Sequence, residues 1–299
     1  MSGTATVKLA KLTVKGAVLE AVDVDAALSP GLVFQLKGGS FRSFGGSVAM
    51  NGAFSLGSPG LDFKTTGKVS GVQAKQALTA YFPKFQNTVE GKFSGDWNLS
   101  GRAFPEPSRM KALVGTLKLS AQDGVLRTAD FKDSIKGVLE KVPFLKNAKV
   151  PDVDEGFKNF RADMKFSGGV IQADPVEVTA KGKGFDVKGR SRIDGVSLDQ
   201  ETYFDVYDPQ GVLPKEISQG AGKPSLQLRI TGLLTSPKTD YGYTAGKLAS
   251  TAGKAAAKGA IQKELGKILG GQQGEGGGQQ GGDPVKNLGD ALKKKMKFF

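Results

Sequence analysis

Apolar and polar residues alternate along most of the first 230 positions of this chain. The alternation is clearest at 113–119 (LVGTLKL), 160–166 (FRADMKF) and 226–230 (LQLRI). A period of two predicts β-strands with one apolar and one polar face. Glycine-containing turn signals recur about every 8 to 12 residues, which is typical of antiparallel neighbours joined by short connections. The sequence therefore predicts a mainly β protein built as an extended antiparallel meandering sheet.

A weak internal repeat supports an extended sheet over a compact α/β fold. The segments 37–41 (KGGSF), 122–126 (QDGVL) and 167–171 (SGGVI) each place glycine before an apolar residue. We interpret these glycines as turns between strands. Repetition of one supersecondary unit favours a sheet that grows by adding hairpins.

Helices are expected to be few and short. Apolar residues recur at helical spacing over 130–142, where Pro143 ends the segment, and a shorter amphipathic piece covers 74–82. Composition then changes after Asp240: 244–269 reads as an amphipathic helix rich in Ala, Lys and Gly, and 270–283 as a Gly/Gln linker. A basic amphipathic helix is predicted at 284–299, so the chain ends in a helical tail.

The basic helix has an apolar stripe surrounded by lysines, which favours contact with anionic lipid headgroups. A solvated helix is the next interpretation, and a nucleic-acid arm the last, because the segment has few arginines and no stacking platform. We expect no nucleic-acid partner. The candidates for membrane contact are Lys286, Leu288, Leu292, Lys293, Lys294, Lys295, Met296, Lys297, Phe298 and Phe299.

The amino-acid composition limits the catalytic and metal-binding chemistry that this chain could perform. The 299 residues include no His and no Cys, which excludes a thiol nucleophile, an imidazole base, a Ser-His-Asp triad and the commonest ligands of zinc, copper and haem. We therefore expect no catalytic residue, no metal and no cofactor. Asp152, Asp154 and Glu155 lack the spacing of a calcium loop, and we interpret them, like Asp205 and Asp208, as turn or cap residues.

The net charge of +13 is partly a property of the tail. Residues 245–299 contain ten Lys and four acidic residues, so +6 of the charge lies there. This distribution points to a membrane surface more than to nucleic acid. Strand-like alternation begins within a few residues of Met1, so we expect a longer chain whose export or anchor segment is missing here.

Several motifs resemble the AsmA-like family. They are 117–120 (LKLS) leading into 123–126 (DGVL), 157–166 leading into 168–171 (GGVI), 182–189 (GKGFDVKG) with 192–194 (RID), and 228–232 (LRITG) with 236–238 (SPK). The resemblance covers 105–243 well and 4–100 loosely, which divides the β part into an N-terminal repeat region, 1–104, and an AsmA C-terminal-like region, 105–243.

The resemblance implies a sheet curled into an apolar groove or open half-barrel, held in the periplasm of a Gram-negative bacterium by an N-terminal helix in the inner membrane. That helix is missing from this sequence. It also implies movement of phospholipid toward the outer membrane, with acyl chains and a further envelope protein as partners. The family offers no catalytic residues to carry over.

The apolar strand positions are thus candidates for a lipid-contacting lining. They are Phe41, Phe54, Phe63, Phe93, Leu117, Leu119, Met164, Phe166, Phe185, Val187, Leu226 and Leu228. Phe suits such a lining because its ring has no polar tip. A second hypothesis is a structural envelope scaffold with a self-packed β-sandwich. A polysaccharide-active enzyme is the third, and would need paired carboxylates in a cleft.

Overall fold

The computed structural model describes residues 2–14, 16–81, 83, 89–126, 136–137, 140, 156–213, 217, 222–248 and 250. The chain divides into two compact units, Met1–Ser250 and Thr251–Phe299, and all described residues belong to the first. The predicted linker and the basic helix with its ten membrane-contact candidates therefore lie outside the described residues. The acidic cluster at 152–155 also lies outside them.

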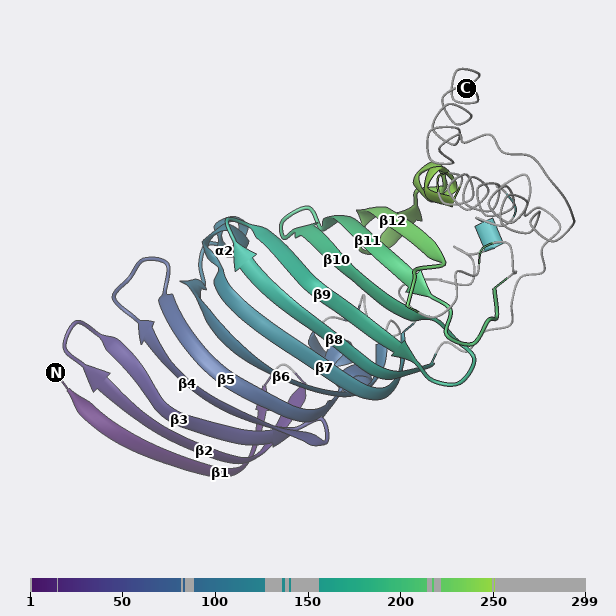
Figure 1. Ribbon diagram of the computed structural model, residues 1–299. Helices are drawn as coiled ribbons and strands as arrows, with labels where there is room; N and C mark the ends of the chain where they lie inside the picture. Colours follow the sequence, from purple (N-terminus) through teal and green to yellow (C-terminus); the bar gives the residue numbers. More distant parts are fainter. Residues whose placement is uncertain are drawn as a thin grey trace, which may run out of the picture. The chain divides into compact units, whose positions relative to one another are not determined.

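In the described part of the chain, thirteen strands form one antiparallel sheet in which each strand pairs with its neighbours in sequence (Figure 1). The predicted extended meander is confirmed, and the sheet is open because its end strands β1 and β13 do not pair with each other. The strands are β1 (Gly3–Val14), β2 (Ala17–Ser29), β3 (Val33–Ser43), β4 (Gly46–Ser55), β5 (Asp62–Gln73), β6 (Val89–Arg102), β7 (Val114–Leu126), β8 (Gly156–Ser167), β9 (Val170–Ala180), β10 (Asp186–Asp194), β11 (Asp199–Tyr207), β12 (Leu226–Leu233) and β13 (Ser236–Thr239).

The helices are short, as expected. The segment predicted at 74–82 forms α1 (Ala74–Tyr81), whereas α2 (Glu106–Ala112) follows Pro105 and was not predicted. Within the predicted helix at 130–142, the described residues 136, 137 and 140 are helical. The helix predicted from 244 begins earlier, at Tyr241, where Asp240 Oδ1 accepts a hydrogen bond of 3.0 Å from the Tyr243 N–H.

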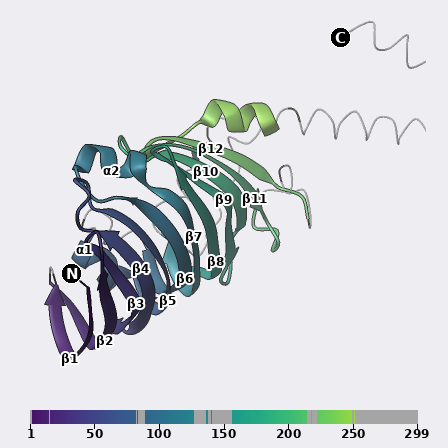
Figure 2. The ribbon, with the colours of Figure 1, turned by 90° about the vertical axis from the view of Figure 1, so that its left-hand side faces the viewer.

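The helices α1 and α2 mark opposite strand ends of the sheet. Because β5 and β6 are antiparallel, α1 after β5 and α2 after β6 lie at opposite strand ends (Figure 2). We call these strand ends the α1 rim and the α2 rim. The α2 rim carries the connections β2–β3, β4–β5, β6–β7, β8–β9, β10–β11 and β12–β13. The sheet is continuous between the two sequence regions 1–104 and 105–243, because β6 pairs with β7 along most of its length.

Two of the three predicted glycine turns are instead bulges inside strands. Gly38 and Gly39 lie within β3, where the register to β4 shifts between Leu36 and Gly39. Asp123 lies within β7 with a φ of 48°. Only Gly168 and Gly169 form a true connection, between β8 and β9. Glycine supplies the conformations of both turns and bulges, so its presence alone does not distinguish them.

Burial is concentrated at the β10–β12 end of the sheet. A cluster of Phe185, Val206, Leu213, Ile217, Leu226, Leu228 and Leu248 forms the main described core. Leu228 is fully buried, and the described residues of β1 are all exposed. Burial thus decreases along the sheet, from the packed end at β12 to the exposed end at β1.

This gradient predicts unequal costs for truncating two leucines of the same face. Leu228→Ala should lower the free energy of unfolding by about 2–5 kcal/mol, because it opens a cavity in the packed cluster. Leu117→Ala should cost clearly less, since Leu117 is only half-buried. Urea unfolding of both variants measures the difference, and equal losses would contradict the gradient.

Candidate functional site

Strand register gathers the apolar side chains on one face of the sheet. Residues directly opposite each other on paired strands point to the same face. Phe34, Phe54 and Phe63 are such partners across β3, β4 and β5. Trp97, Leu117 and Met164 are partners across β6, β7 and β8. We call this the apolar face.

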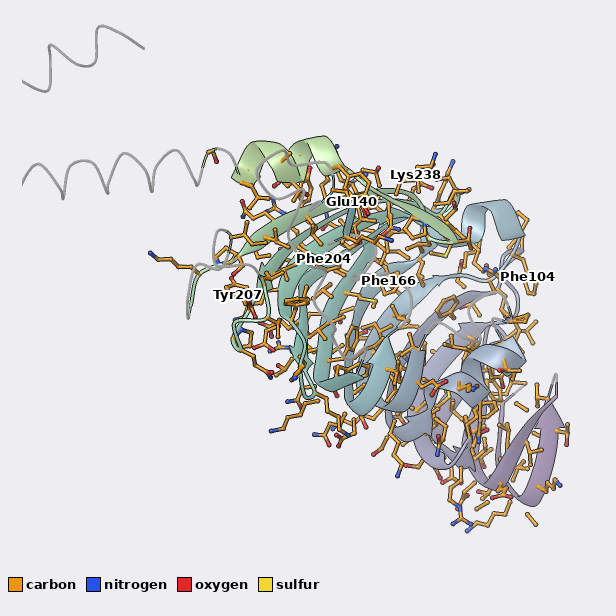
Figure 3. All side chains as sticks on the ribbon, turned by 90° about the vertical axis from the view of Figure 1, so that its right-hand side faces the viewer. Phe104, Glu140, Phe166, Phe204, Tyr207 and Lys238 are labelled. Atoms are coloured by element: carbon orange, nitrogen blue, oxygen red, sulfur yellow. The ribbon has the colours of Figure 1, made fainter. Side chains whose placement is uncertain are left out.

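The predicted lining residues share this face. One row of cross-strand partners begins at Phe41 in β3, passes through Leu119 in β7 and ends at Leu228 in β12. The other strand residues predicted for the lining lie in parallel rows on the same face. Phe185 precedes β10 and belongs to the buried cluster. The face is concave: Figure 3 looks into the curve of the sheet, where Phe166 and Phe204 lie.

Glycines opposite large side chains leave room for rings to lie against this face. Gly67 is the cross-strand partner of Trp97, and a Cβ on Gly67 would overlap the indole ring. Gly189 has the same relation to Phe204. The rings therefore extend over the neighbouring strand instead of standing above the sheet. The Trp97 Nε1–H donates to Thr65 Oγ1 at 3.3 Å, which satisfies its polar atom on the face itself.

Exposure divides the lining candidates into two groups. Phe41, Phe54, Phe63, Phe93, Leu117, Leu119 and Met164, on β3 to β8, are only partly buried. Phe166, Phe185, Val187, Leu226 and Leu228 are buried. Leu213, Ile217 and Leu248 complete the cluster around Phe185, Leu226 and Leu228. Phe185, Leu226 and Leu228 are therefore core residues covered by the rest of the protein. The accessible part of the apolar face extends from β3 to β8.

Some residues of the face were missed in the sequence. Phe34, Trp97, Phe160 and Phe204 all lie on it by register. The alternation of Phe93, Trp97 and Leu99 along β6 was a usable signal, but the glycines and polar residues between them weakened it.

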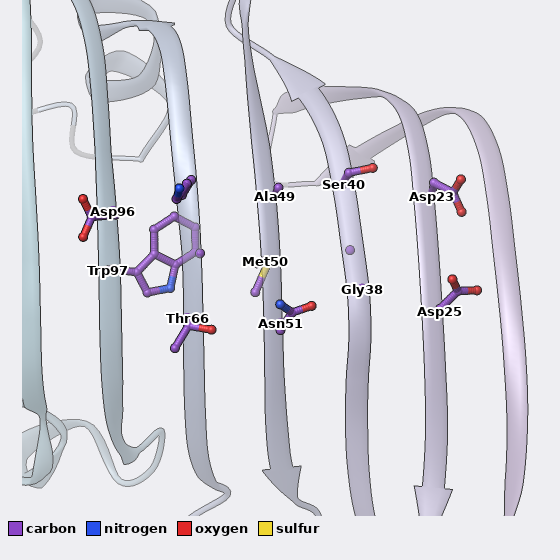
Figure 4. Close-up of a pocket in the computed structure, with 13 residues that line it drawn as sticks. Asp23, Asp25, Gly38, Ser40, Ala49, Met50, Asn51, Thr66, Asp96 and Trp97 are labelled. Carbon is purple, nitrogen blue, oxygen red and sulfur yellow. The ribbon is translucent and has the colours of Figure 1, made fainter.

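The opposite face is polar and holds open hollows. The hollow in Figure 4 has a volume of about 820 Å³ and is lined by Asp23, Asp25, Lys68 and Asp96 among others. Asp23 is paired with Lys8 at 3.4 Å. In the described part of the chain, no group of three or more acidic side chains could hold a metal ion. The hollow thus offers exposed charged side chains but, among the described residues, no cluster suited to metal binding.

The two aspartates interpreted as turn residues differ in place. Asp208 accepts hydrogen bonds from the backbone N–H groups of Val212 and Leu213, at 2.9 and 2.8 Å, as expected of a turn residue. Asp205 instead lies within β11 and accepts a bond of 2.6 Å from Gln227 Nε2. The assignment of Asp205 to a turn was wrong, because acidic residues also occur at alternate positions of a strand, on its polar face.

An ion-pair network lies on the polar face at the packed end. Arg229 contacts Glu201 at 2.7 Å and Asp240 at 3.1 Å, and the Tyr203 hydroxyl donates to Glu201 at 2.7 Å. The hydrogen bonds from Tyr203 and Arg229 lower the pKa of Glu201. The pKa of Asp240 is lowered first by the Tyr243 N–H and also by Arg229. The network joins β11 and β12 to the start of the following helix.

Comparison with known proteins finds no matching family model, no matching curated protein and no matching solved structure. Among the described helices, none combines the length and the apolar character needed to cross a bilayer. The candidate site therefore rests on the geometry of the apolar face.

The lowered carboxyl pKa values predict a pH-dependent effect of Arg229→Gln. Because the folded-state pKa of Glu201 and Asp240 lies below the unfolded value, their stabilising contribution exists at neutral pH and is lost as pH falls through the folded pKa. The variant should lower Tm by a few degrees at pH 7, and the difference from wild type should shrink below about pH 4.

Thermal unfolding followed by circular dichroism measures this difference. Arg42→Gln, which removes an exposed arginine from β3 on the polar face, is the control and should change Tm little at either pH. A Tm difference for Arg229→Gln that is equally large in acid would contradict the assigned network.

Proposed function

We propose that this protein binds the acyl chains of phospholipids on the apolar face between β3 and β8. The supporting observation is one continuous apolar face, assembled by register from strand to strand and still partly exposed over this stretch. Contiguous exposed apolar surface on a soluble protein usually marks an interaction site. The headgroup of the phospholipid would stay in water beyond the strands while its acyl chains lie against the apolar face.

The surface suits a flexible, chemically uniform ligand. Burial of apolar area contributes about 25 cal/mol per Å², or about 0.8 kcal/mol for each buried CH₂ group. Phe41, Phe93 and Leu117 present hydrocarbon without polar tips, and Trp97 has its own polar partner in Thr65. Such a surface favours acyl chains by area and does not select a headgroup.

The sheet also differs between its ends in a way that fits this function. The packed cluster around Leu228 covers the apolar face at β10–β12, whereas the face is accessible toward β3. We propose that chains lie along the accessible stretch and stop at the packed end. No cofactor is required for this type of binding.

The wider setting is proposed from the sequence resemblance to AsmA-like proteins. In this setting the protein is a periplasmic, inner-membrane-anchored component that passes phospholipid between the inner and outer membranes and supports outer-membrane biogenesis. The basic segment 284–299 would contact a membrane surface, and a further envelope protein would receive the lipid.

A structural scaffold is the second candidate function. It is favoured by the β10–β12 end, where Leu213, Ile217 and Leu248 seal the apolar face with the protein's own residues. A sheet that seals its whole apolar face in this way would have no room for lipid.

Lipid uptake tests the proposal with a matched pair of variants. Leu117 and Met164 are cross-strand partners on the apolar face, and Thr116 and Lys165 are the neighbouring partners on the polar face. Leu117→Lys with Met164→Asp should reduce uptake of a fluorescent phospholipid at least about tenfold, because it places a charged pair where hydrocarbon would lie. Thr116→Lys with Lys165→Asp makes the same pair on the other face and should leave uptake unchanged.

Native mass spectrometry of the purified full chain supplies the second readout. Copurified phospholipid should be present in wild type and reduced only in the apolar-face variant. A lipid-free wild type that also takes up no fluorescent phospholipid would reject acyl-chain binding and leave the scaffold as the better hypothesis.

A further inference from the structure

The outer side of β1 is a free edge of the sheet. β1 pairs with β2 on one side, and in the described part of the chain no strand pairs with its other side (Figure 1). All residues of β1 are exposed, including Val7 at 43% and Leu9 at 40%. A strand in this position presents a row of backbone N–H and C=O groups without backbone partners. We call this row the β1 edge.

The opposite end of the sheet is protected against further pairing. β13 has only four residues, and one of them, Pro237, lacks a backbone N–H. The chain then leaves the sheet: the Asp240 N–H donates to the Arg229 carbonyl at 2.8 Å, and a helix begins at Tyr241. Short edge strands, proline and covering elements commonly prevent unwanted strand pairing. β1 has twelve residues and no proline, so this protection is present at β13 and missing at β1.

The two lysines of β1 are balanced by carboxylates on one side only. Lys8 and Asp23 are cross-strand partners and form an ion pair of 3.4 Å. Lys11 is the cross-strand partner of Glu20. β1 itself contains no acidic residue, and no described strand supplies a charge on the other side of either lysine. The β1 edge is therefore positively charged.

Charges in this sheet follow one rule across the strands. Wherever the registers of the described strands place two charged residues directly opposite each other, the two have opposite signs. Facing residues of opposite charge stabilise a strand pair, and like charges destabilise it. The two longest rows of this kind are Lys68–Asp96–Lys118–Asp163 over β5 to β8 and Arg161–Glu177–Lys188–Asp205 over β8 to β11. The four middle residues of these rows have an opposite charge on both sides.

Lys8 and Lys11 each stand at the end of such a row. Lys8 is followed by Asp23, and Lys11 is followed by Glu20 and then by Arg42. Both rows stop at the β1 edge. A strand added there therefore continues the rule when it places an acidic residue opposite each lysine.

The apolar side chains of β1 set a second requirement. Val7 is the partner of Val24, and Val24 is the partner of Gly39 in the row that reaches Met50 on the apolar face. Val7 stays exposed because β1 has a neighbour on one side only. An added strand with apolar residues at alternate positions would cover Val7, with a gain of about 25 cal/mol per Å² of buried apolar surface.

A second copy of this chain does not meet the charge requirement. Pairing of two β1 strands would bring four lysines to one junction and no acidic residue, because β1 contains none. Like charges on neighbouring strands are destabilising. The charges therefore favour a different polypeptide as the partner.

We propose that the β1 edge binds an extended segment of another protein by β-strand addition. The segment runs antiparallel to β1, alternates apolar and polar residues, and carries acidic residues opposite Lys8 and Lys11. Backbone hydrogen bonds supply affinity, and the two lysines select the charge of the segment. This surface is separate from the proposed acyl-chain site between β3 and β8.

Synthetic twelve-residue peptides, matched in length to β1, test the proposal on the full chain. The acidic peptide alternates valine and threonine and carries two glutamates three positions apart, the spacing of Lys8 and Lys11. The basic peptide has lysine in place of each glutamate. Fluorescence anisotropy of the labelled peptides should show at least about tenfold tighter binding of the acidic one, with a smaller difference at high salt. Equal affinities, or no binding of the acidic peptide, would overturn the proposal.

A pair of variants tests the two lysines. Lys8→Gln with Lys11→Gln should bind both peptides with equal affinity, because glutamine removes the charge and keeps a long polar side chain. Lys238→Gln, on the opposite end strand β13, is the matched control and should keep the wild-type preference. A preference for the acidic peptide that persists in the β1 variant would contradict the selecting role of Lys8 and Lys11.

Two N-methylated versions of the acidic peptide test strand pairing on the wild-type chain. Antiparallel partners alternate between hydrogen-bonded and non-hydrogen-bonded pairs, so only every second residue of an added strand donates to β1. Methylation of one alternate set of backbone nitrogens should abolish binding, and methylation of the other set should leave binding nearly unchanged. Equal effects of the two sets would overturn strand addition.

Hydrogen exchange distinguishes a peptide partner from a second copy. The acidic peptide should slow exchange of β1 amides and leave the amides of β13 unchanged. Protection of β1 that rises with protein concentration in the absence of peptide would overturn the proposal in favour of a second copy.

Discussion

The register of the antiparallel pairing is the constraint on which the rest of this structure depends. Side chains alternate between faces with a period of two, so a slip of one residue would bring the lysines of the polar face to the apolar face. Bulges preserve the correct faces where the spacing in sequence is odd. Phe34 and Phe41 are seven positions apart, and both reach the apolar face because the register to β4 shifts between Leu36 and Gly39. Val69 and Val72 share it through the shift that includes Gly71.

One face of the sheet is apolar throughout, and the residues that cover it decide which part is core and which part is accessible. At β10–β12, residues from the connections and the following helix cover the face and form the core around Leu228. From β3 to β8 the same kind of face is only partly buried, with Phe93 and Leu117 accessible. Stability therefore comes largely from the packed end and from strand pairing, which leaves the accessible stretch free to serve the proposed binding of acyl chains.

Particular elements show how far the sequence could be interpreted. The meander and α1 were predictable because both depend on local periodicity. The bulges at Gly38 and Asp123 were mistaken for turns, since glycine and aspartate suit both. α2 was missed because its seven residues are too few to show a helical period. Asp205 was expected in a turn but lies in a strand. The sequence could not show this, because only the hydrogen bond with Gln227 on the paired strand reveals the position of Asp205.

The sequence by itself determined the fold class and the identity of the apolar candidates, because the alternation of apolar and polar residues is a property of neighbouring positions. Only the tertiary structure decided that Phe41 and Leu228 belong to one row and that the first is accessible while the second is buried. It also placed Leu32 and Phe104, far apart in sequence, along one rim. The physical reason is that register, bulges and covering elements bring distant segments together, and no local pattern records those contacts.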